Sequence, residues 1–337
     1  MTVSSMVQCA TTGLVWLSRV TRTPPEAESE GARHRVDDVI DRYELPRTPL
    51  LSRWTVDRGA AFRADAQWVD AAWSNADTRI IAVGGGRVAM DTHGLAWRSP
   101  RDGVPDGERL LLGVDGGVAL GAVCVAEPPE NGGGLREIAA TLSERDAGLA
   151  VEAVALASWH ATHQHCPRCG HRTVISEGGW SRRCLYDDTL HYPRTDPAVI
   201  MLVVDEDDRC LLGHAASWPD RRYSTLAGFV EPGETPDRAV AREVAEEAGV
   251  VVDRSRYVGA QPWPFPASLM LGYYASAAPQ IARPDGTEIQ DVRWFSRDEF
   301  TEALTAEEVL VPSSISIASL LIEGWYGKPL PSTGTFR

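Results

Sequence analysis

Short apolar runs separated by glycine-rich turns characterise the first half of the chain. Runs at 79–83, 110–112 and 118–125 have the length and aliphatic content typical of β-strands. Three consecutive glycines at 84–86 follow the first run, and no helix start comes after them. We therefore interpret them as a hairpin turn and not as a phosphate-binding loop. The pattern predicts a small sheet-based domain.

A helical pattern separates this domain from a second group of strands. It extends from 135 to about 164, with Ser143 as a plausible N-cap inside the stretch. The unbroken apolar run at 198–204 then predicts a buried strand. Further strands are expected at 210–212, 269–276 and 292–295.

Three helices are predicted in the last third of the chain. Thr235 is a suitable N-cap and Gly249 a suitable C-terminal residue for a helix at 236–248. Ser296 begins a second helix, and a third is expected at 313–325. The buried face of this third helix is predicted to contain Ile315, Ala318, Leu321, Ile322 and Trp325. Strands that alternate with helices predict an α/β domain.

The helix at 236–248 gathers negative charge on one side. With about 100° between successive residues, Glu243, Glu246 and Glu247 share one arc, and aliphatic residues occupy the arc beside it. Carboxylates within one turn repel each other. A hard divalent cation such as Mg²⁺, which takes oxygen ligands and bridges carboxylates to phosphates, would relieve this repulsion. The alternative is a solvated acidic helix face.

Composition limits the classes of function. A chain of 337 residues with 43% hydrophobic content can form more than one domain. The net charge of −14 disfavours non-specific binding to nucleic acid. No apolar run approaches the roughly 20 residues of a membrane span, and the first residues do not resemble a signal peptide. We therefore expect a cytoplasmic protein without a membrane partner.

Three of the six cysteines have metal-site spacing. Cys166 and Cys169 form a CPxCG knuckle, and Cys184 follows after fourteen residues. A standard zinc ribbon has its fourth cysteine three residues later, where this chain has Asp187. Two interpretations stay open: a zinc site completed by a carboxylate or histidine, or a ribbon that has lost its metal. The nearby histidines are His165, His171 and His191; the remaining cysteines, Cys9, Cys124 and Cys210, are expected to be inert thiols.

A segment rich in proline and aromatic residues follows the acidic helix. It consists of Gln261, Pro262, Trp263, Pro264, Phe265, Pro266, Ala267 and Ser268. Proline at every second position favours an extended backbone without internal hydrogen bonds. Trp263 and Phe265 are then expected to project on one side as an apolar wall against which a flat base can dock.

The acidic helix and the turn before it resemble the Nudix box at every defined position. The matching residues are Gly228, Glu234, Arg242, Glu243, Val244, Glu246, Glu247, Gly249 and Val250. The resemblance implies hydrolysis of a nucleoside diphosphate linked to another moiety, with metal ions on Glu243 and Glu247. It also implies that Glu246 is a third metal-site candidate, and that Glu234 and Arg242 form an ion pair that braces the loop.

The segment at 261–268 resembles the additional motif of the NADH pyrophosphatase branch of the Nudix family. Tyr192-Pro193-Arg194 matches the segment that leads into the Nudix domain of that branch, and Ala260 stands where the branch usually has Ser. The resemblance spans roughly residues 43–325 and implies a Nudix α/β/α sandwich preceded by a small α+β domain and a zinc-ribbon-like module. The expected segments are a flexible tail at 1–40, the α+β domain at 41–164, the ribbon at 165–192 and the Nudix domain at 193–330.

The same resemblance assigns site residues. Ala227, through its carbonyl, would join Glu243, Glu247 and Glu288 in holding roughly two to three Mg²⁺ or Mn²⁺ ions. The segment 261–268 and the backbone near Ala318 would contact the substrate. Tyr192 and Phe229 would sandwich the nicotinamide ring, with Tyr192 contributed by the other subunit of a homodimer.

These assignments predict hydrolysis of NADH and NAD⁺ to nicotinamide mononucleotide and AMP. Because the reacting bond is identical, the same site would remove NAD caps from RNA. Glu246 is the expected general base and Glu288 its rival. The alternatives are a Nudix hydrolase that prefers ADP-ribose or FAD, and a non-catalytic zinc-ribbon protein acting as an RNA-binding or regulatory adaptor.

Overall fold

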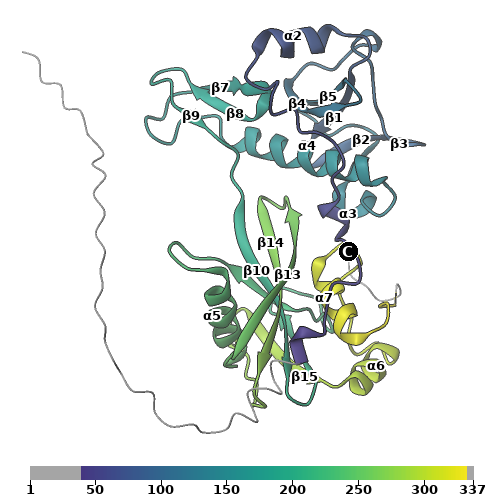
Figure 1. Ribbon diagram of the computed structural model, residues 1–337, viewed down its shortest axis with the longest axis vertical. Helices are drawn as coiled ribbons and strands as arrows, with labels where there is room; N and C mark the ends of the chain where they lie inside the picture. The colour runs from purple at the N-terminus through teal and green to yellow at the C-terminus, as the bar shows by residue number, and fades with distance from the viewer. Residues whose placement is uncertain (1–38, 332–337) are drawn as a thin grey trace, which may run out of the picture.

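The computed structural model describes residues 39–331 and places two mixed sheets in separate lobes (Figure 1). The tail predicted at 1–40 lies, except for its last two residues, outside the described part of the chain, as does Cys9. A small three-stranded sheet lies beside the first lobe. The domain boundaries expected above stay predictions.

The first sheet has the strand order β3-β2-β1-β5-β4, with β6 paired to β2. Its strands are β1 (Arg79–Gly84), β2 (Arg87–Asp91), β3 (Gly94–Leu95), β4 (Glu108–Asp115), β5 (Val118–Cys124) and β6 (Gly132–Gly134). The predicted hairpin at the glycine triplet is confirmed: Gly84 pairs with Arg87, and Gly85 and Gly86 between them have positive φ.

Helices cover this sheet. They are the 3₁₀ turn η1 (Leu50–Ser52), α2 (Ala66–Ser74), the 3₁₀ turn η2 (Pro100–Asp102), α3 (Leu135–Ile138) and α4 (Glu144–Thr162). The helical pattern predicted from 135 to about 164 is thus two helices, because Ser143 accepts a hydrogen bond from the Asp146 N–H and begins α4 anew. The sequence pattern did not indicate α2, whose N-cap is Asp65.

The small sheet consists of β7 (Thr173–Ser176), β8 (Ser181–Cys184) and β9 (Leu190–His191), with the 3₁₀ turn η3 (Glu177–Gly179) between the first two. Arg182 on β8 is buried and donates to Thr173 and to Glu108 of the first lobe. The three-stranded sheet is therefore anchored to the N-terminal lobe.

The second sheet has the order β13-β14-β10-β11-β15, with β12 paired to β10. Its strands are β10 (Asp196–Asp205), β11 (Cys210–Ala215), β12 (Leu226–Phe229), β13 (Arg254–Trp263), β14 (Ser268–Ala277) and β15 (Ile289–Phe295). Alternate residues of β10 pack on opposite faces: Val199, Met201 and Val203 share a core with α5, and Ile200 and Leu202 share one with α7.

Helix α5 (Pro236–Ala248) lies on one face of this sheet, and α6 (Arg297–Thr305) and α7 (Ile317–Tyr326) lie on the other (Figure 1). The bounds predicted for α5 are confirmed, and Gly249 has φ 64°. Ser296 begins α6 as predicted, and it forms a capping box with Glu299. The last helix begins at Ile317 and not at the predicted 313, so Ile315 precedes it. All five residues predicted for its buried face are nevertheless buried. The predicted α/β/α sandwich is confirmed.

The segment before the first lobe packs on the second. Val39, Ile40 and Tyr43 belong to the same core as Tyr274 and Trp325. Tyr43 also donates a hydrogen bond to Asp208. Residues near position 40 thus stabilise the C-terminal lobe, although they precede the N-terminal one in the chain.

The expected extended conformation of the proline-rich segment is confirmed for 261–263 and is wrong for 264–267. Strand β13 continues to Trp263, and the chain turns at 264–267 before β14. Trp263 pairs with Ser268, and the Phe265 N–H donates to the Trp263 carbonyl at 2.7 Å. Long-range strand pairing overrides the local preference of the prolines.

Candidate active site

Carboxylates from α5 and from the loop before β15 meet beside β12. Glu243, Glu247 and Glu288 line a cavity of about 750 Å³, which we call the carboxylate lobe. Ala227 on β12 also lines it. The predicted metal ligands, which lie up to 61 positions apart in the sequence, are therefore brought together by the fold.

Glu247 is the most perturbed of these groups. The residue is 8% exposed, and its Oε2 atom is buried without a hydrogen-bond partner. Burial, together with the neighbouring carboxylates of Glu243 and Glu288, raises the pKa of Glu247 to about 8. Burial also raises the pKa of Glu243. An oxygen atom with no partner in a cluster of carboxylates fits a divalent cation.

Arg242 holds the surrounding loop. Its Nε and Nη2 atoms donate to the two carboxylate oxygens of Glu234 at 2.9 Å each, so the predicted ion pair is present. Its Nη1 donates to Glu243 at 2.8 Å and to Glu246 at 2.9 Å, and Nη2 also donates to the Phe229 carbonyl. One guanidinium thus joins the loop, the helix and β12.

Gly228 provides the space that Glu243 occupies. A Cβ atom at this position would lie 1.9 Å from the Glu243 carboxyl carbon. Position 228 therefore requires glycine because the Glu243 carboxylate lies against its backbone, and not because its φ is positive.

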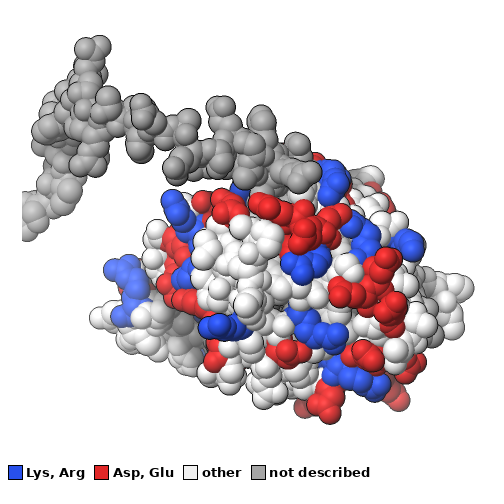
Figure 2. Space-filling view, turned by 90° about the horizontal axis from the view of Figure 1, so that it is seen from below, with Lys and Arg blue, Asp and Glu red and all other residues white. Residues whose placement is uncertain are grey.

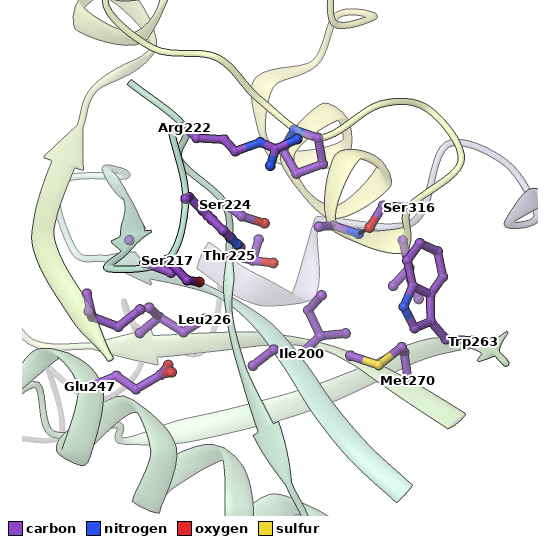
Figure 3. Close-up of a pocket in the computed structure, with 18 of the residues that line it drawn as sticks. Ile200, Ser217, Arg222, Ser224, Thr225, Leu226, Glu247, Trp263, Met270 and Ser316 are labelled. Carbon is purple, nitrogen blue, oxygen red and sulfur yellow. Dashed lines mark hydrogen bonds between the residues drawn. The ribbon is translucent and has the colours of Figure 1, made fainter. Parts of the chain in front are cut away.

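A second cavity of about 700 Å³, which we call the apolar lobe, adjoins the first. The two lobes share Ala227, Glu247, Met270, Thr287 and Glu288. Figure 3 shows Glu247 on one side of the apolar lobe, Trp263 and Met270 on another, and Arg222 above. A carboxylate cluster beside a pocket of this size can accommodate a diphosphate and an attached nucleoside.

The segment at 261–268 is divided between cavities. Gln261 is fully buried; its Nε2 donates to the Ile315 carbonyl at 2.5 Å, and its Oε1 accepts from the Ile317 N–H at 2.6 Å. It therefore positions the start of α7. Trp263 lines the apolar lobe, and Ser268 lines the carboxylate lobe.

The remaining residues of the segment lie elsewhere. Phe265 lines neither lobe: its ring meets that of Trp263 edge-on at 5.1 Å, and both rings pack on the N-terminal core. A separate cavity lies between the N-terminal and C-terminal lobes of the protein, and it is lined by Pro262, Pro264, Pro266 and Ala267.

The aromatic pair assigned by resemblance is not assembled within one chain. Phe229 lines the carboxylate lobe and is 57% exposed, whereas Tyr192 is 62% exposed and lines neither lobe. Ala318 lines the apolar lobe, where its N–H donates to the Ser316 hydroxyl. The contribution of Tyr192 across a dimer stays a prediction.

The cysteine cluster is assembled as a metal site. One possible ligand atom each from Cys166, Cys169, Cys184 and Asp187 lies within 4.8 Å of all the others. Hydrogen bonds from the Cys184 thiol and from Thr189 hold the pKa of Asp187 at about 2. Three thiols and an ionised carboxylate in this arrangement fit tetrahedral zinc.

The two knuckles have the same backbone geometry. The Cys166 N–H donates to the carbonyl five residues later, and the Cys184 N–H does the same. Gly170 and Asp188, each four residues after the first cysteine of its knuckle, both have positive φ. Asp187 therefore occupies the position that corresponds to Cys169.

The comparisons with known proteins agree with this geometry. Residues 194–312 match the NUDIX domain, and residues 161–192 match the NADH pyrophosphatase zinc ribbon domain. The chain is 38% identical over 307 residues to the NAD-capped RNA hydrolase NudC of Mycobacterium tuberculosis, covering 84% of this chain and 96% of that protein. The chain belongs to the NADH pyrophosphatase branch of the Nudix hydrolases.

Two further relatives cover less of this Nudix chain. Human NAD-capped RNA hydrolase NUDT12 is 43% identical over 196 residues, covering 55% of this chain and 42% of that protein. A NUDIX hydrolase of solved structure from Nitrosomonas europaea is 24% identical, with a TM-score of 0.39, and covers 52% of this chain and 96% of that chain.

The Nudix pocket also contains residues that sequence reasoning did not indicate. Arg136 of α3 lines the apolar lobe and lies over the rings of Trp263 and Phe265, at 5.3 and 4.5 Å from their centroids. Trp218 and Arg222 also line it. No sequence signal could have identified Arg136, because it belongs to the N-terminal lobe and reaches the pocket only through domain packing.

On the face shown in Figure 2, acidic and basic side chains are interspersed and form no continuous basic surface. Between residues 39 and 331, no helix is long and apolar enough to cross a membrane.

Proposed function

We propose that this Nudix hydrolase cleaves the diphosphate of NADH and NAD⁺ to nicotinamide mononucleotide and AMP, and removes NAD caps from RNA by the same cleavage. The observation that carries the proposal is the buried, unpartnered Oε2 of Glu247 among the carboxylates of Glu243 and Glu288. The names of the relatives, which are NAD-capped RNA hydrolases, support the substrate class.

The carboxylate lobe and the apolar lobe of the site would have different roles. Ala227, Glu243, Glu247 and Glu288 would hold Mg²⁺ or Mn²⁺, roughly two to three ions, which supply positive charge to the phosphoryl oxygens and lower the pKa of water. Arg242 orients Glu243 and Glu246 through its hydrogen bonds. The apolar lobe holds a nucleoside and excludes water from it.

A carboxylate must also accept a proton from the attacking water. We propose Glu246 as the general base because it faces the carboxylate lobe without being buried among the ligands. Glu288 is the rival because it borders both lobes.

A product-release assay tests the function: the free dinucleotides yield AMP, whereas NAD-capped RNA yields nicotinamide mononucleotide and RNA with a 5′-monophosphate. Purified protein with Mg²⁺ or Mn²⁺ is given NADH, NAD⁺, NAD-capped RNA, ADP-ribose and FAD in parallel, and products are separated by chromatography. We expect kcat/KM to be highest for the nicotinamide dinucleotides. A higher value for ADP-ribose or FAD would favour the alternative Nudix specificity, and no cleavage of any substrate would favour the adaptor.

The two aromatic residues of the hairpin tip are expected to act differently. Trp263→Ala removes a wall of the apolar lobe, and we expect KM for NADH to rise about tenfold, since an aromatic contact contributes about 1 kcal/mol beyond its buried area. Phe265→Ala removes packing on the N-terminal core, and we expect a stability loss of about 2 kcal/mol with KM nearly unchanged. Steady-state kinetics and chemical denaturation of both variants separate the roles; equal kinetic losses would contradict them.

We also propose that Cys166, Cys169, Cys184 and Asp187 bind one structural zinc ion. A carboxylate at one corner would make the site weaker and more sensitive to pH than four cysteines would. The ribbon would support a homodimer in which Tyr192 reaches the partner's site. The stacked rings of His171 and Tyr186, 4.3 Å apart, lie beside the knuckles.

Replacing Asp187 by Cys tests the mixed site. We expect Asp187→Cys to retain zinc about tenfold longer against a chelator, because thiolate is the softer ligand, while NADH turnover hardly changes. Elemental analysis and thiol counting of protein purified without chelator provide the measurement. Three fast-reacting thiols and no zinc in the wild type would instead support an empty ribbon.

A further inference from the structure

A third cavity lies between the two lobes of the protein, behind the tip of the β13–β14 hairpin, and the proposed hydrolysis does not use it. This interdomain cavity has a volume of about 330 Å³. One side is formed by α4, with Gly148, Glu152 and Ala155, and another by the indoles of Trp54 and Trp180. The hairpin closes it with Pro262, Trp263, Pro264, Pro266, Ala267 and Ser268.

Glu152 is an unsatisfied polar group in the wall of this cavity. The residue is 5% exposed, and both of its carboxylate oxygens are buried without a hydrogen-bond partner. The Arg58 Nε atom is 3.9 Å from Oε2, too far for a hydrogen bond. Burial raises the pKa of Glu152 to about 8. A buried carboxylate without partners destabilises a fold, so its presence at a cavity points to a ligand.

A second unsatisfied group has the opposite polarity. The Nε atom of Arg53, which also lines the interdomain cavity, is buried without a hydrogen-bond partner, and the Glu144 Oε1 atom lies 3.8 Å from it, too far for a hydrogen bond. When Glu152 is ionised, a form that ligand donors would favour, the cavity presents two acceptor oxygens and one N–H donor. Arg58 and Arg194, whose side chains are 51% and 66% exposed, also line it, and the Arg194 Nε atom donates to Asp196 at 2.6 Å.

A guanine base has the complementary groups. Its N1–H and exocyclic amine donate side by side, which matches the two oxygens of one carboxylate, and its O6 atom accepts a hydrogen bond. Uracil lacks such a pair of donors. The volume is near the lower limit for ligand pockets, which suits one base and not a dinucleotide.

We propose that the interdomain cavity binds a guanine nucleotide, with the base hydrogen-bonded to Glu152 and Arg53 and the phosphate near Arg58 and Arg194. The nucleotide is either free or part of an RNA substrate. The cavity shares Trp263 with the apolar lobe and Ser268 with the carboxylate lobe, so RNA in the reaction site has a short route to it. The RNA source rests on the proposed function; the free nucleotide does not.

Calorimetric titration with GMP tests the site in the full chain. The wild type is compared with Glu152→Gln, which removes one acceptor, and Ala155→Phe, which fills the cavity. Glu130→Gln is the matched control, because Glu130 is exposed on a loop away from the cavity lining. We expect at least tenfold weaker GMP binding in the first two variants, unchanged binding in the control, and unchanged NADH hydrolysis in all three.

A second arm distinguishes the two sources. The wild type and Glu152→Gln are each given NAD-capped RNAs that carry either guanine or uracil after the cap. If the wild type hydrolyses the guanine RNA faster and Glu152→Gln does not, the bound guanine nucleotide is part of the RNA substrate. GMP binding without such a preference identifies the free nucleotide. The proposal is overturned if GMP binds equally to all proteins, or if neither GMP binding nor a base preference depends on Glu152. Failure to hydrolyse NADH would count against the proposed function alone.

The stability of the ligand-free protein provides an independent check. An unfolded glutamate titrates near 4.5 and Glu152 in the folded protein near 8, so the folded state binds more protons between these values. The free energy of unfolding of the wild type should therefore fall as pH rises through this window. Glu152→Gln should remove this contribution and be more stable than the wild type above pH 8. A less stable variant at that pH would indicate a structural carboxylate.

Discussion

Replacing Glu247 by Gln is expected to lower kcat for NADH by at least about 100-fold while the fold is retained. The side chain is nearly isosteric and already buried, so packing is preserved, but the negative charge that would hold a cation beside the phosphoryl group is lost. Because burial disfavours the charged form of Glu247, its replacement by a neutral amide should even raise thermal stability slightly.

Steady-state kinetics at saturating Mg²⁺ and thermal unfolding measure the two effects. Glu243→Gln should lose activity similarly, since its carboxylate lines the same lobe. Asp237→Asn is the matched control, because Asp237 is on the same helix but exposed and outside the lobe. Turnover within a few-fold of wild type for Glu247→Gln would refute the metal assignment.

Gly228→Ala is expected to have the second-largest effect. The added Cβ would fall 1.9 Å from the carboxyl carbon of Glu243, so that side chain must leave its position and its hydrogen bond from Arg242. We expect kcat to fall about 100-fold, a loss similar to that of removing one preorganised group. The KM of NADH should change much less, because the apolar lobe is not lined by Gly228.

The control for this variant is another glycine with ordinary backbone geometry. Gly134 has φ −78°, and a Cβ there would meet its nearest neighbour, Arg87 Nη1, at 3.7 Å. Gly134→Ala should therefore leave NADH turnover unchanged. Gly228→Ala with normal kcat would mean that Glu243 functions from a different position, and the ligand set proposed here would need revision.

The sequence by itself determined the local elements around the reaction site. The α5 helix follows from Pro236 at its first position and Gly249 after its last, because helix initiation and left-handed termination depend on residues adjacent in the chain. Thr235 occupies the predicted N-cap position, but its side chain makes no capping hydrogen bond. The arc of Glu243 and Glu247 follows from helical periodicity, and the knuckle spacing of the cysteines follows from the reach of one tight turn. These features depend on short-range geometry, which a sequence pattern records directly.

Tertiary structure decided what depends on contacts between distant segments. The proline-rich segment forms a hairpin tip because β14 pairs with β13. Gln261 hydrogen-bonds to the backbone before α7 because the packing of α7 on the sheet places the two segments together. Arg136 reached the apolar lobe, and Glu152 came to lie in the interdomain cavity, only through docking of one lobe on the other. Neither side chain has a local signature, because the burial and partners of a charged group are set by residues remote in sequence.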